Sequence, residues 1–211
     1  MKSNLLVTDI RPYLKAGAIS SNPGSKKLII DINYETAFVL YAGEVRRYGI
    51  RQDEYICDEV YHEIVEEVLV KRAKLRAMNI LQRSDQSEKM LRDKLAAGMY
   101  PQEVIDNTIE YVKKYGYIDD SRYAYNYVNA KSRVKSRKVI MAELKNRGIS
   151  EEMISQLYCD RSPDEEDLLI QKLLQKKKYN RESASYEEKM KIKAYLMRKG
   201  FSMDRISAMM D

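Results

Sequence analysis

The chain has 211 residues, of which 44% are hydrophobic and 33% charged, with only 8 Gly and 4 Pro. This composition excludes a disordered or collagen-like chain and favours a folded helical protein, in one large domain or two small ones. The 38 Lys and Arg residues against 32 Asp and Glu give a formal net charge of +6, which favours an anionic partner such as nucleic acid or an acidic protein groove.

The N-terminal section predicts a small β element rather than an export signal. Asp9 and Pro12 interrupt the short apolar patch near the start, so no signal-peptide core is expected. Residues 27–43 contain two β-branched apolar runs around an Asn-Tyr-Glu turn, which predicts a β-hairpin followed by a short helix at 43–49. Because an isolated hairpin is marginally stable, we expect it to pack on the long helix that begins near Cys57.

Cysteine content and hydropathy indicate a reducing compartment. The two cysteines, Cys57 and Cys159, are too few and too far apart for a disulfide framework or a cysteine-based zinc site. No apolar run approaches the roughly 20 residues that are needed to cross a bilayer. We therefore expect a cytoplasmic protein that contacts no membrane.

Three segments share one pattern without gaps: residues 91–109, 140–158 and 192–210. In each segment an apolar residue is followed four positions later by leucine, then by an apolar turn residue, then by isoleucine. The leucines are Leu95, Leu144 and Leu196, and the isoleucines are Ile105, Ile154 and Ile206. Apolar residues four positions apart lie on one stripe of a helix, so each segment predicts two helices joined by a tight turn.

The predicted turns carry residues that end one helix and begin the next. Gly148 and Gly200 stand where a helix end favours a left-handed residue, and Met99 takes that place in the first copy. Proline or serine follows the turn, and an acidic residue lies in the next turn of helix, where the helix dipole favours negative charge. The second helix of each pair is expected to start there.

The repeat period of about 50 residues leaves room for a third helix in each copy. Helical spacing predicts these helices at 62–82, 119–135 and 164–177. The helix at 119–135 is indicated by Tyr123, Tyr127, Ala130 and Val134, which stand at helical spacing. One irregular helical domain with chance similarity is the alternative to a repeat array.

The expected fold class is mainly α: tandem three-helix repeats forming an elongated array, with a small N-terminal β-hairpin extension. The expected domains are residues 1–58 for the hairpin extension and residues 59–116, 117–160 and 161–211 for the three repeats.

Adjacent aspartates in the segment GYIDDSRYA, residues 116–124, have two interpretations. In the first, the glycine closes one helix, the Tyr-Ile pair packs toward the core, and Asp119 and Asp120 accept the first N–H bonds of the next helix. In the second they bind a metal, which requires further His, Cys or carboxylate ligands. The single histidine, His62, lies in another segment, so we predict caps and no bound metal.

Catalytic and cofactor-binding motifs are missing from the sequence. No motif pairs His62 with a serine or cysteine nucleophile, and the ring is expected to cap or line its helix. No GxxxxGK phosphate loop, GxGxxG segment or CxxC pair occurs. We predict a protein that is not an enzyme and needs no cofactor.

Tyrosine is abundant, with 17 residues against 2 Phe and no Trp. Six lie at one repeat junction: Tyr111, Tyr115, Tyr117, Tyr123, Tyr125 and Tyr127. Tyrosines can stack on single-stranded bases, but the helical spacing of Tyr123 and Tyr127 is more typical of a core edge with hydrated hydroxyl groups.

Charge is distributed unevenly along the second and third repeats. Residues 131–147 carry seven basic side chains against Glu143, and residues 150–167 carry seven acidic side chains against Arg161. One interpretation is a solvated face, and the other is a docking surface for phosphate or for a partner of alternating charge. The basic candidates for partner or DNA binding are Lys131, Arg133, Lys135, Arg137, Lys138, Lys145 and Arg147, of which Arg133, Lys135, Arg137 and Lys138 are expected to converge on one exposed edge.

With this repeat and the GYIDDSRYA segment, the chain resembles the RecX family of bacterial recombination regulators over roughly residues 60–211. That family shows a Gly-Tyr-Ile-Asp-Asp-x-Arg-aromatic-Ala segment between its first two repeats, and Leu-x-x-Lys-Gly-aromatic turns. Met99 in place of glycine and the missing Lys-Gly pair in KSRKVI, residues 135–140, depart from the pattern. The matching residues are Gly116, Tyr117, Ile118, Asp119, Asp120, Arg122, Tyr123 and Ala124.

The resemblance implies a non-enzymatic modulator of RecA that acts in DNA repair, the SOS response and homologous recombination. Such proteins lie in the groove of the RecA–DNA filament and lower strand exchange, ATP turnover and LexA co-cleavage. The implied partners are the RecA filament and DNA, contacted through the filament or directly, and a monomer is expected. The alternative is a stand-alone protein that binds single- or double-stranded nucleic acid through its basic face without RecA.

Overall fold

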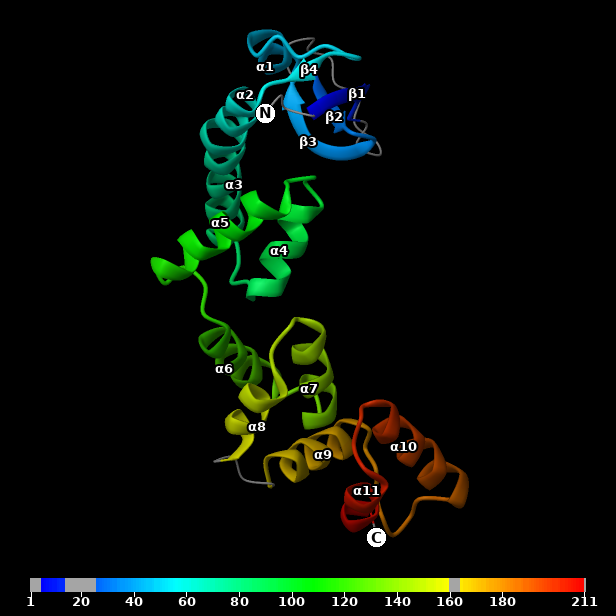
Figure 1. Ribbon diagram of the computed structural model, residues 1–211. Coiled ribbons are helices and arrows are strands. Elements are labelled where there is room, and N and C mark those ends of the chain that lie inside the picture. The colour runs from blue at the N-terminus through cyan, green and yellow to red at the C-terminus, as the bar shows by residue number, and fades with distance from the viewer. Residues whose placement is uncertain (1–4, 14–25, 160–163, 211) are drawn as a thin grey trace. The chain divides into compact units, whose positions relative to one another are not determined.

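The computed structural model describes residues 5–13, 26–159 and 164–210, and it is mainly helical (Figure 1). The chain forms two compact units. One comprises residues 1–85 and 91–117, and the other residues 86–90 and 118–211, so the second unit includes the start of α4 (Glu88–Ala96). Within the described residues, no helix combines the length and the apolar character that crossing a membrane requires.

The first unit contains a four-stranded antiparallel sheet in the order β3-β2-β1-β4. The predicted hairpin is confirmed as β2 and β3, and its turn residues Asn33 and Tyr34 have φ angles of 51° and 69°, which suit a two-residue hairpin turn. Strands β1 and β4 are not predicted by the sequence pattern, and they extend the hairpin into a sheet that is more stable than two strands alone. The strands are β1 (Leu5–Pro12), β2 (Lys27–Ile32), β3 (Glu35–Tyr41) and β4 (Tyr55–Ile56).

The sheet packs on a long helix, as expected. The rings of Phe38 in β3 and Tyr61 in the helix lie 5.8 Å apart. Further along, Arg72 donates a hydrogen bond to the carbonyl oxygen of Val39 at 3.2 Å and forms an ion pair with Glu44. The helical elements are α1 (Ala42–Arg47), then α2 (Asp58–Glu63), a π-helical stretch (Ile64–Val70) and α3 (Lys71–Leu81) in direct succession.

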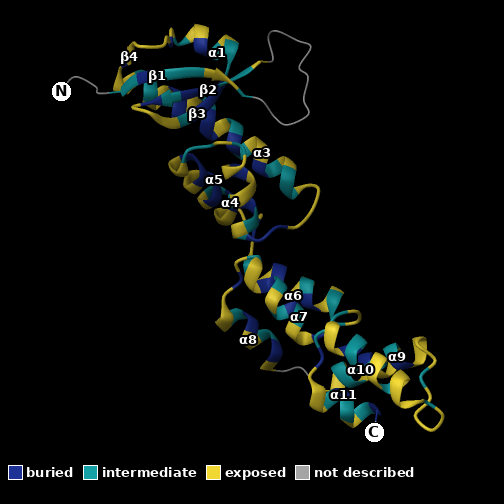
Figure 2. Cartoon of the chain, turned by 90° about the vertical axis from the view of Figure 1, so that its right-hand side faces the viewer, coloured by how far each residue is buried: buried dark blue, intermediate teal, exposed yellow. Residues whose placement is uncertain are grey.

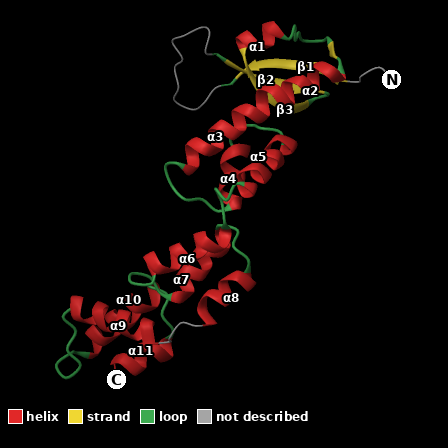
Figure 3. Ribbon diagram, turned by 90° about the vertical axis from the view of Figure 1, so that its left-hand side faces the viewer, coloured by secondary structure: helices red, strands yellow, loops and turns green. Residues whose placement is uncertain are grey.

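The first repeat is built from α3, α4 and α5 (Gln102–Lys114), which Figure 3 shows in red, and α5 packs against α3. Apolar residues of α4 and α5 at helical spacing are buried, because their stripes face the core of the repeat. Those at most 2% exposed are Leu91, Leu95, Val104, Ile105, Ile109 and Val112.

The second unit contains the helices of the second and third repeats. One core forms among α6, α7 and α8 around Leu144 and Ile154, and another among α9, α10 and α11 around Leu196 and Ile206. Figure 2 marks these buried residues in dark blue. The helices are α6 (Asp120–Lys131), α7 (Arg137–Asn146), α8 (Glu151–Cys159), α9 (Asp164–Lys176), α10 (Tyr186–Arg198) and α11 (Met203–Met210).

The helix predicted at 119–135 is shorter than expected. It ends at Lys131, and a turn leads to Ser136, which is fully buried and accepts the N–H bond of Val139 as the N-cap of α7. A serine in that position favours the start of a new helix over continuation of the old one. As a result the predicted end of this helix is wrong: Val134 lies beyond α6, and both Ala130 and Val134 are exposed.

The turn residues of the repeat have the predicted left-handed backbone. The φ angles of Met99, Gly148 and Gly200 are 57°, 85° and 90°. The leucines and isoleucines that define the register are all at most 2% exposed. The helix–turn–helix pattern is therefore confirmed in all three copies, whereas the expected domain boundaries stay a prediction and the one between residues 160 and 161 lies outside the described residues.

The turn glycines of the second unit pack directly against the starts of other helices. A Cβ atom at Gly148 would lie 2.5 Å from the Cβ of Lys89 in the first turn of α4. A Cβ atom at Gly200 would lie 2.5 Å from the Oγ of Ser136, the N-cap of α7. Real Cβ contacts are not this short, so each turn approaches its neighbour closely only because it has no side chain.

Candidate partner-binding surface

The two aspartates of the segment 116–124 serve the starts of two different helices. Asp119 is the N-cap of α6, and its Oδ1 accepts a hydrogen bond from the backbone N–H of Arg122 at 3.0 Å. The Oδ1 of Asp120 accepts the N–H of Glu88, the first residue of α4, at 2.8 Å. The sequence predicted that these aspartates cap the next helix, which Asp119 does. The bond from Asp120 to the start of α4 depends on tertiary packing, and sequence spacing does not predict it.

The residues just before the aspartates end α5. Gly116 has a φ angle of 68°, and the backbone N–H of Tyr117 bonds to the carbonyl oxygen of Val112 at 2.9 Å, which closes the helix end. Ile118 is 5% exposed, as expected, but Tyr117 is 43% exposed. The expectation that Tyr117 packs toward the core is therefore wrong, because this turn directs its side chain outward.

Two tyrosines of α6 and one arginine form a packed cluster. The rings of Tyr123 and Tyr127 are stacked with an interplanar angle of 18°, and the guanidinium carbon of Arg147 lies 4.3 Å from the centroid of Tyr127. Arg147 also donates to the Tyr123 hydroxyl, and its carbonyl oxygen accepts the hydroxyl of the buried Ser87 at 2.5 Å. Tyr123 is 5% exposed, so these tyrosines form a core edge as expected. The expectation that their hydroxyl groups are hydrated is wrong, because the Tyr123 hydroxyl accepts a bond from Arg147 and the Tyr127 hydroxyl is bonded to Glu143.

The Tyr127 hydroxyl donates a hydrogen bond of 2.6 Å to Glu143 in α7. Burial, together with this acceptor, raises the pKa of Tyr127 to about 12. Burial also opposes ionisation of Glu143, but its bonds to Lys135 and Tyr127 outweigh that effect and hold the pKa of Glu143 below its usual value. A neutral phenol and an ionised carboxylate therefore join α6 to α7 at neutral pH.

Three of the seven basic candidates are engaged in such internal contacts. Lys135 pairs with Glu143, and Lys145 pairs with Glu151 at the start of α8. Arg147 lies in the tyrosine cluster. The structure therefore does not bring Lys135 onto an exposed edge with its sequence neighbours, because its ammonium group is drawn to the half-buried carboxylate of Glu143.

The other four candidates lie near the junction of α6 and α7. Lys131 is half-buried as the last residue of α6, and Arg133 is exposed in the turn that follows. Arg137 and Lys138 are exposed in the first turn of α7. The guanidinium carbon of Arg137 lies 4.2 Å from the ring centroid of Tyr158 in α8, a cation–π contact that restrains the side chain.

A groove of about 490 Å³ beside α7 collects three of the basic candidates. It combines positive charge with one carboxylate, from Glu166, and with apolar surface from Met141 and Ala142 of α7. Such a lining suits a partner that presents negative charge beside an apolar group. The lining residues are Arg137, Lys138, Met141, Ala142, Lys145, Glu166, Gly200, Phe201 and Ser202.

The acidic run at the start of α9 is also engaged. The Oε1 of Glu166 accepts the backbone N–H of Arg137 at 2.7 Å and so caps α7 from another repeat. Arg205 in α11 donates to Asp167 at 2.8 Å and lies 3.6 Å from Glu166. Some of the acidic side chains of this run are therefore bonded to groups of the same chain and do not need an external partner to balance their charge. The sequence did not single out Glu166 or Arg205 as functional residues, although Glu166 belongs to the acidic run at 150–167 that the sequence made evident.

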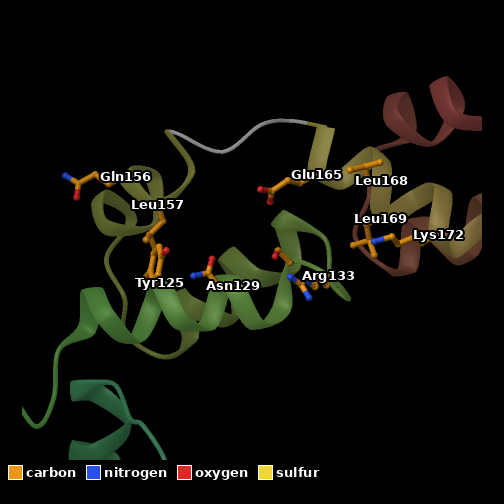
Figure 4. A pocket seen from close by; sticks show the side chains of 10 residues that line it. Tyr125, Asn129, Arg133, Gln156, Leu157, Glu165, Leu168, Leu169 and Lys172 are labelled. Atoms are coloured by element: carbon orange, nitrogen blue, oxygen red, sulfur yellow. The ribbon is translucent and has the colours of Figure 1, made fainter.

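A second groove, of about 690 Å³, is lined by residues of α6, α8 and α9 and of the turn after α6. Figure 4 shows Arg133 on one wall and Glu165 on the opposite wall of the groove, which Tyr125 and Leu157 also line. Tyr125 is 55% exposed and Leu168, which also lines the groove, is 56% exposed. This groove offers mixed charge and apolar surface rather than a basic site.

Titratable groups suited to metal binding do not gather in the part of the chain that the structure describes. Among residues 5–13, 26–159 and 164–210, no three His, Cys, Asp or Glu side chains are placed to hold a metal ion together. His62 lies edge-on to Tyr61, with ring centroids 6.0 Å apart. The thiols of Cys57 and Cys159 are exposed.

Protein-family models match all three repeats. The model of the first three-helix domain of RecX matches residues 73–111, the second residues 119–157 and the third residues 164–210. A regulatory protein RecX from Caldanaerobacter subterraneus subsp. tengcongensis is 32% identical over 183 residues, which are 86% of this chain and 91% of that protein. Another, from Clostridium perfringens strain 13, is 31% identical over 172 residues, covering 79% of this chain and 80% of that protein.

Solved structures show the same fold. A crystal structure of regulatory protein RecX matches with a TM-score of 0.61 and 20% identity, over 97% of this chain and 98% of that chain. The crystal structure of RecX from Lactobacillus salivarius matches with a TM-score of 0.55 and 25% identity, over 67% of this chain and 94% of that chain.

Proposed function

This chain belongs to the RecX family of regulatory proteins, and we propose that it binds the RecA–DNA filament and inhibits the recombinase and co-protease activities of RecA. The observation that carries the proposal is the tandem match of all three RecX domains, in which the leucine before the turn and the isoleucine after it are buried in every repeat. In this proposal the protein acts in the cytoplasm and binds the filament as a monomer.

We assign the first turn of α7 to the filament interface. Arg137 and Lys138 place two exposed positive charges next to each other, and the exposed Lys145 extends the same groove. A RecA–DNA filament presents both carboxylates and phosphates, and a groove that combines positive charge with a carboxylate suits such a mixed surface. The contact of Arg137 with Tyr158 supports this assignment, because a restrained side chain loses less entropy on binding.

Inhibition in this proposal requires binding only. A protein that binds the assembled filament and occupies its groove competes with the incoming DNA strand and with LexA, and it does so without a cofactor, a metal ion or a catalytic group of its own. The extent of inhibition then follows the occupancy of the filament, which is set by the concentration of the protein relative to its dissociation constant.

Strand exchange by RecA, measured with this protein titrated in, tests the proposal. We expect product formation to fall progressively as the protein is added, and LexA co-cleavage to fall over the same concentration range. Unchanged strand exchange and co-cleavage at protein concentrations that saturate the filament would overturn inhibition. Increased strand exchange would reverse the sign of the regulation while keeping RecA as the partner.

A further inference from the structure

Three tyrosines at the end of α5 form a series of neighbouring rings. The ring centroids of Tyr111 and Tyr115 are 4.8 Å apart, and those of Tyr115 and Tyr117 are 6.3 Å apart. Tyr115 is 59% exposed and Tyr117 is 43% exposed. Exposed aromatic rings in a series are costly to leave in water, and they are typical of a surface that receives a flat or apolar ligand.

The tyrosines of α6 differ from this series. Tyr123 and Tyr127 are covered by Arg147 and have hydroxyl groups bonded within the protein, so their rings belong to the core edge. Tyr115 and Tyr117 instead keep a large part of their surface in solvent. The packing of the repeat therefore accounts for the tyrosines of α6 but not for those at the end of α5.

The surroundings of the series are basic. The ammonium group of Lys74 lies 4.8 Å from the ring centroid of Tyr111, and Lys113 and Lys114 are exposed in the last turn of α5. Of the carboxylates close in sequence, Glu110 is exposed, and Asp119 is engaged as the cap of α6. Positive charge around exposed aromatic rings favours a ligand that carries both flat rings and negative charge.

We propose that Tyr111, Tyr115 and Tyr117 form a stacking platform for the unpaired bases of single-stranded nucleic acid, with Lys74, Lys113 and Lys114 near its phosphates. Bases of a duplex are already stacked on one another, so only a single strand offers free base faces to these rings. Stacking on aromatic rings tolerates any base, and the site is expected to bind without sequence preference. This inference does not depend on RecA, and its test is made without it.

Two oligonucleotides of equal length separate stacking from attraction to phosphate: an oligothymidylate, and an abasic strand with the same backbone. We expect the full-length protein to bind the oligothymidylate at least about fivefold more tightly, since one stacked base contributes that much or more. Replacing Tyr115→Ala and Tyr117→Ala together should abolish this preference while binding to the abasic strand is kept. Tyr186→Ala, at a tyrosine of α10 that is 79% exposed, is the matched control and should leave the preference intact.

Tyr115→Trp provides an independent readout, because the chain has no tryptophan of its own. Its fluorescence should be quenched by the oligothymidylate and not by the abasic strand, whether or not the double alanine variant folds. Equal affinity of the parent for both strands, or fluorescence that responds to both alike, would overturn the platform. Quenching by a proline-rich peptide but not by the oligothymidylate would also overturn it, in favour of a peptide ligand.

Discussion

Gly148 approaches Lys89 so closely that a Cβ atom on the glycine would lie 2.5 Å from the Cβ of the lysine. Gly200 approaches Ser136 in the same way. Met99 occupies the equivalent turn of the first repeat with a similar left-handed backbone, and its side chain is 39% exposed. The turn itself therefore accepts a side chain, and glycine is needed where the turn packs against the start of another helix.

Alanine substitutions separate the cost of the left-handed backbone from the cost of the close packing. Gly148→Ala, Gly200→Ala and Gly116→Ala all place a Cβ atom on a left-handed residue, which costs about 1–2 kcal/mol of unfolding free energy. Gly116 has no other heavy atom within 4 Å of such a Cβ, so its variant should lose that amount and no more. Gly148→Ala and Gly200→Ala should each lose about 1–3 kcal/mol more than Gly116→Ala, because their new Cβ atoms overpack against the neighbouring helix. Urea denaturation measures the difference, and equal losses at all three positions would contradict close packing of the turns.

Asp119 and Asp120 should each contribute to stability through a different helix, α6 and α4. Asp119→Ala and Asp120→Ala are each expected to lower the free energy of unfolding by about 0.5–2 kcal/mol, because each exposes an unpaired N–H at a different helix start. Because the two residues are adjacent, the difference between the loss in the double variant and the sum of the single losses measures the coupling of the two caps. Asp120→Asn keeps an acceptor for the N–H of Glu88 and serves as the control. Metal bound stoichiometrically to the purified parent and absent from the double alanine variant would refute the cap assignment.

Tyr127 should ionise later than an ordinary tyrosine. Its pKa is raised from 10.0 to about 12 by burial and by its bond to Glu143. Because the folded-state pKa lies above the unfolded one, the stabilisation is fully present below pH 10.0 and is lost as the pH rises through about 12. Tyrosinate absorbance of the parent minus that of Tyr127→Phe should therefore titrate near pH 12. A difference curve with its midpoint at the ordinary value would show that Tyr127 does not keep this burial and its bond to Glu143 in solution.

Charge reversal tests the assigned interface. Changing Arg137→Glu and Lys138→Glu together should weaken inhibition of RecA strand exchange about tenfold or more, with less sensitivity to added salt, because attraction to the filament becomes repulsion. Alanine at both positions should have a smaller effect. Lys191→Glu with Arg198→Glu, exposed on α10, makes the same change of charge elsewhere and is the control. If the Arg137→Glu, Lys138→Glu variant inhibits RecA as strongly as the parent and melts at the same temperature, the interface lies on another surface.

Local patterns predicted most of the helical repeat. The spacing of Leu95, Leu144 and Leu196 and the turn residues after them follow from helix periodicity, which short-range sequence records. Strand β1 was not predicted, because its side chains are mostly half-buried and only Val7 is fully buried. Helix α6 was predicted too long, because the spacing of Val134 fits the stripe while the capping by Ser136 interrupts it.

The candidate surface was predicted less completely than the fold. The basic run 131–147 was evident from the sequence, but which of its members stay exposed depends on partners distant in the chain. Glu143 engages Lys135, and Tyr127 engages Arg147, through contacts that no short-range pattern encodes. The cap that Glu166 provides to α7 is likewise a tertiary contact.

Binding of the labelled full-length protein to RecA assembled on single-stranded DNA, compared with the same DNA without RecA, tests the central claim most directly. Fluorescence anisotropy at matched salt gives both dissociation constants. We expect saturable binding to the filament that is clearly tighter than binding to the naked strand, because the proposed interface meets RecA as well as DNA. Equal affinity for the two, or no binding to the filament, would contradict the account and favour a stand-alone nucleic-acid-binding protein.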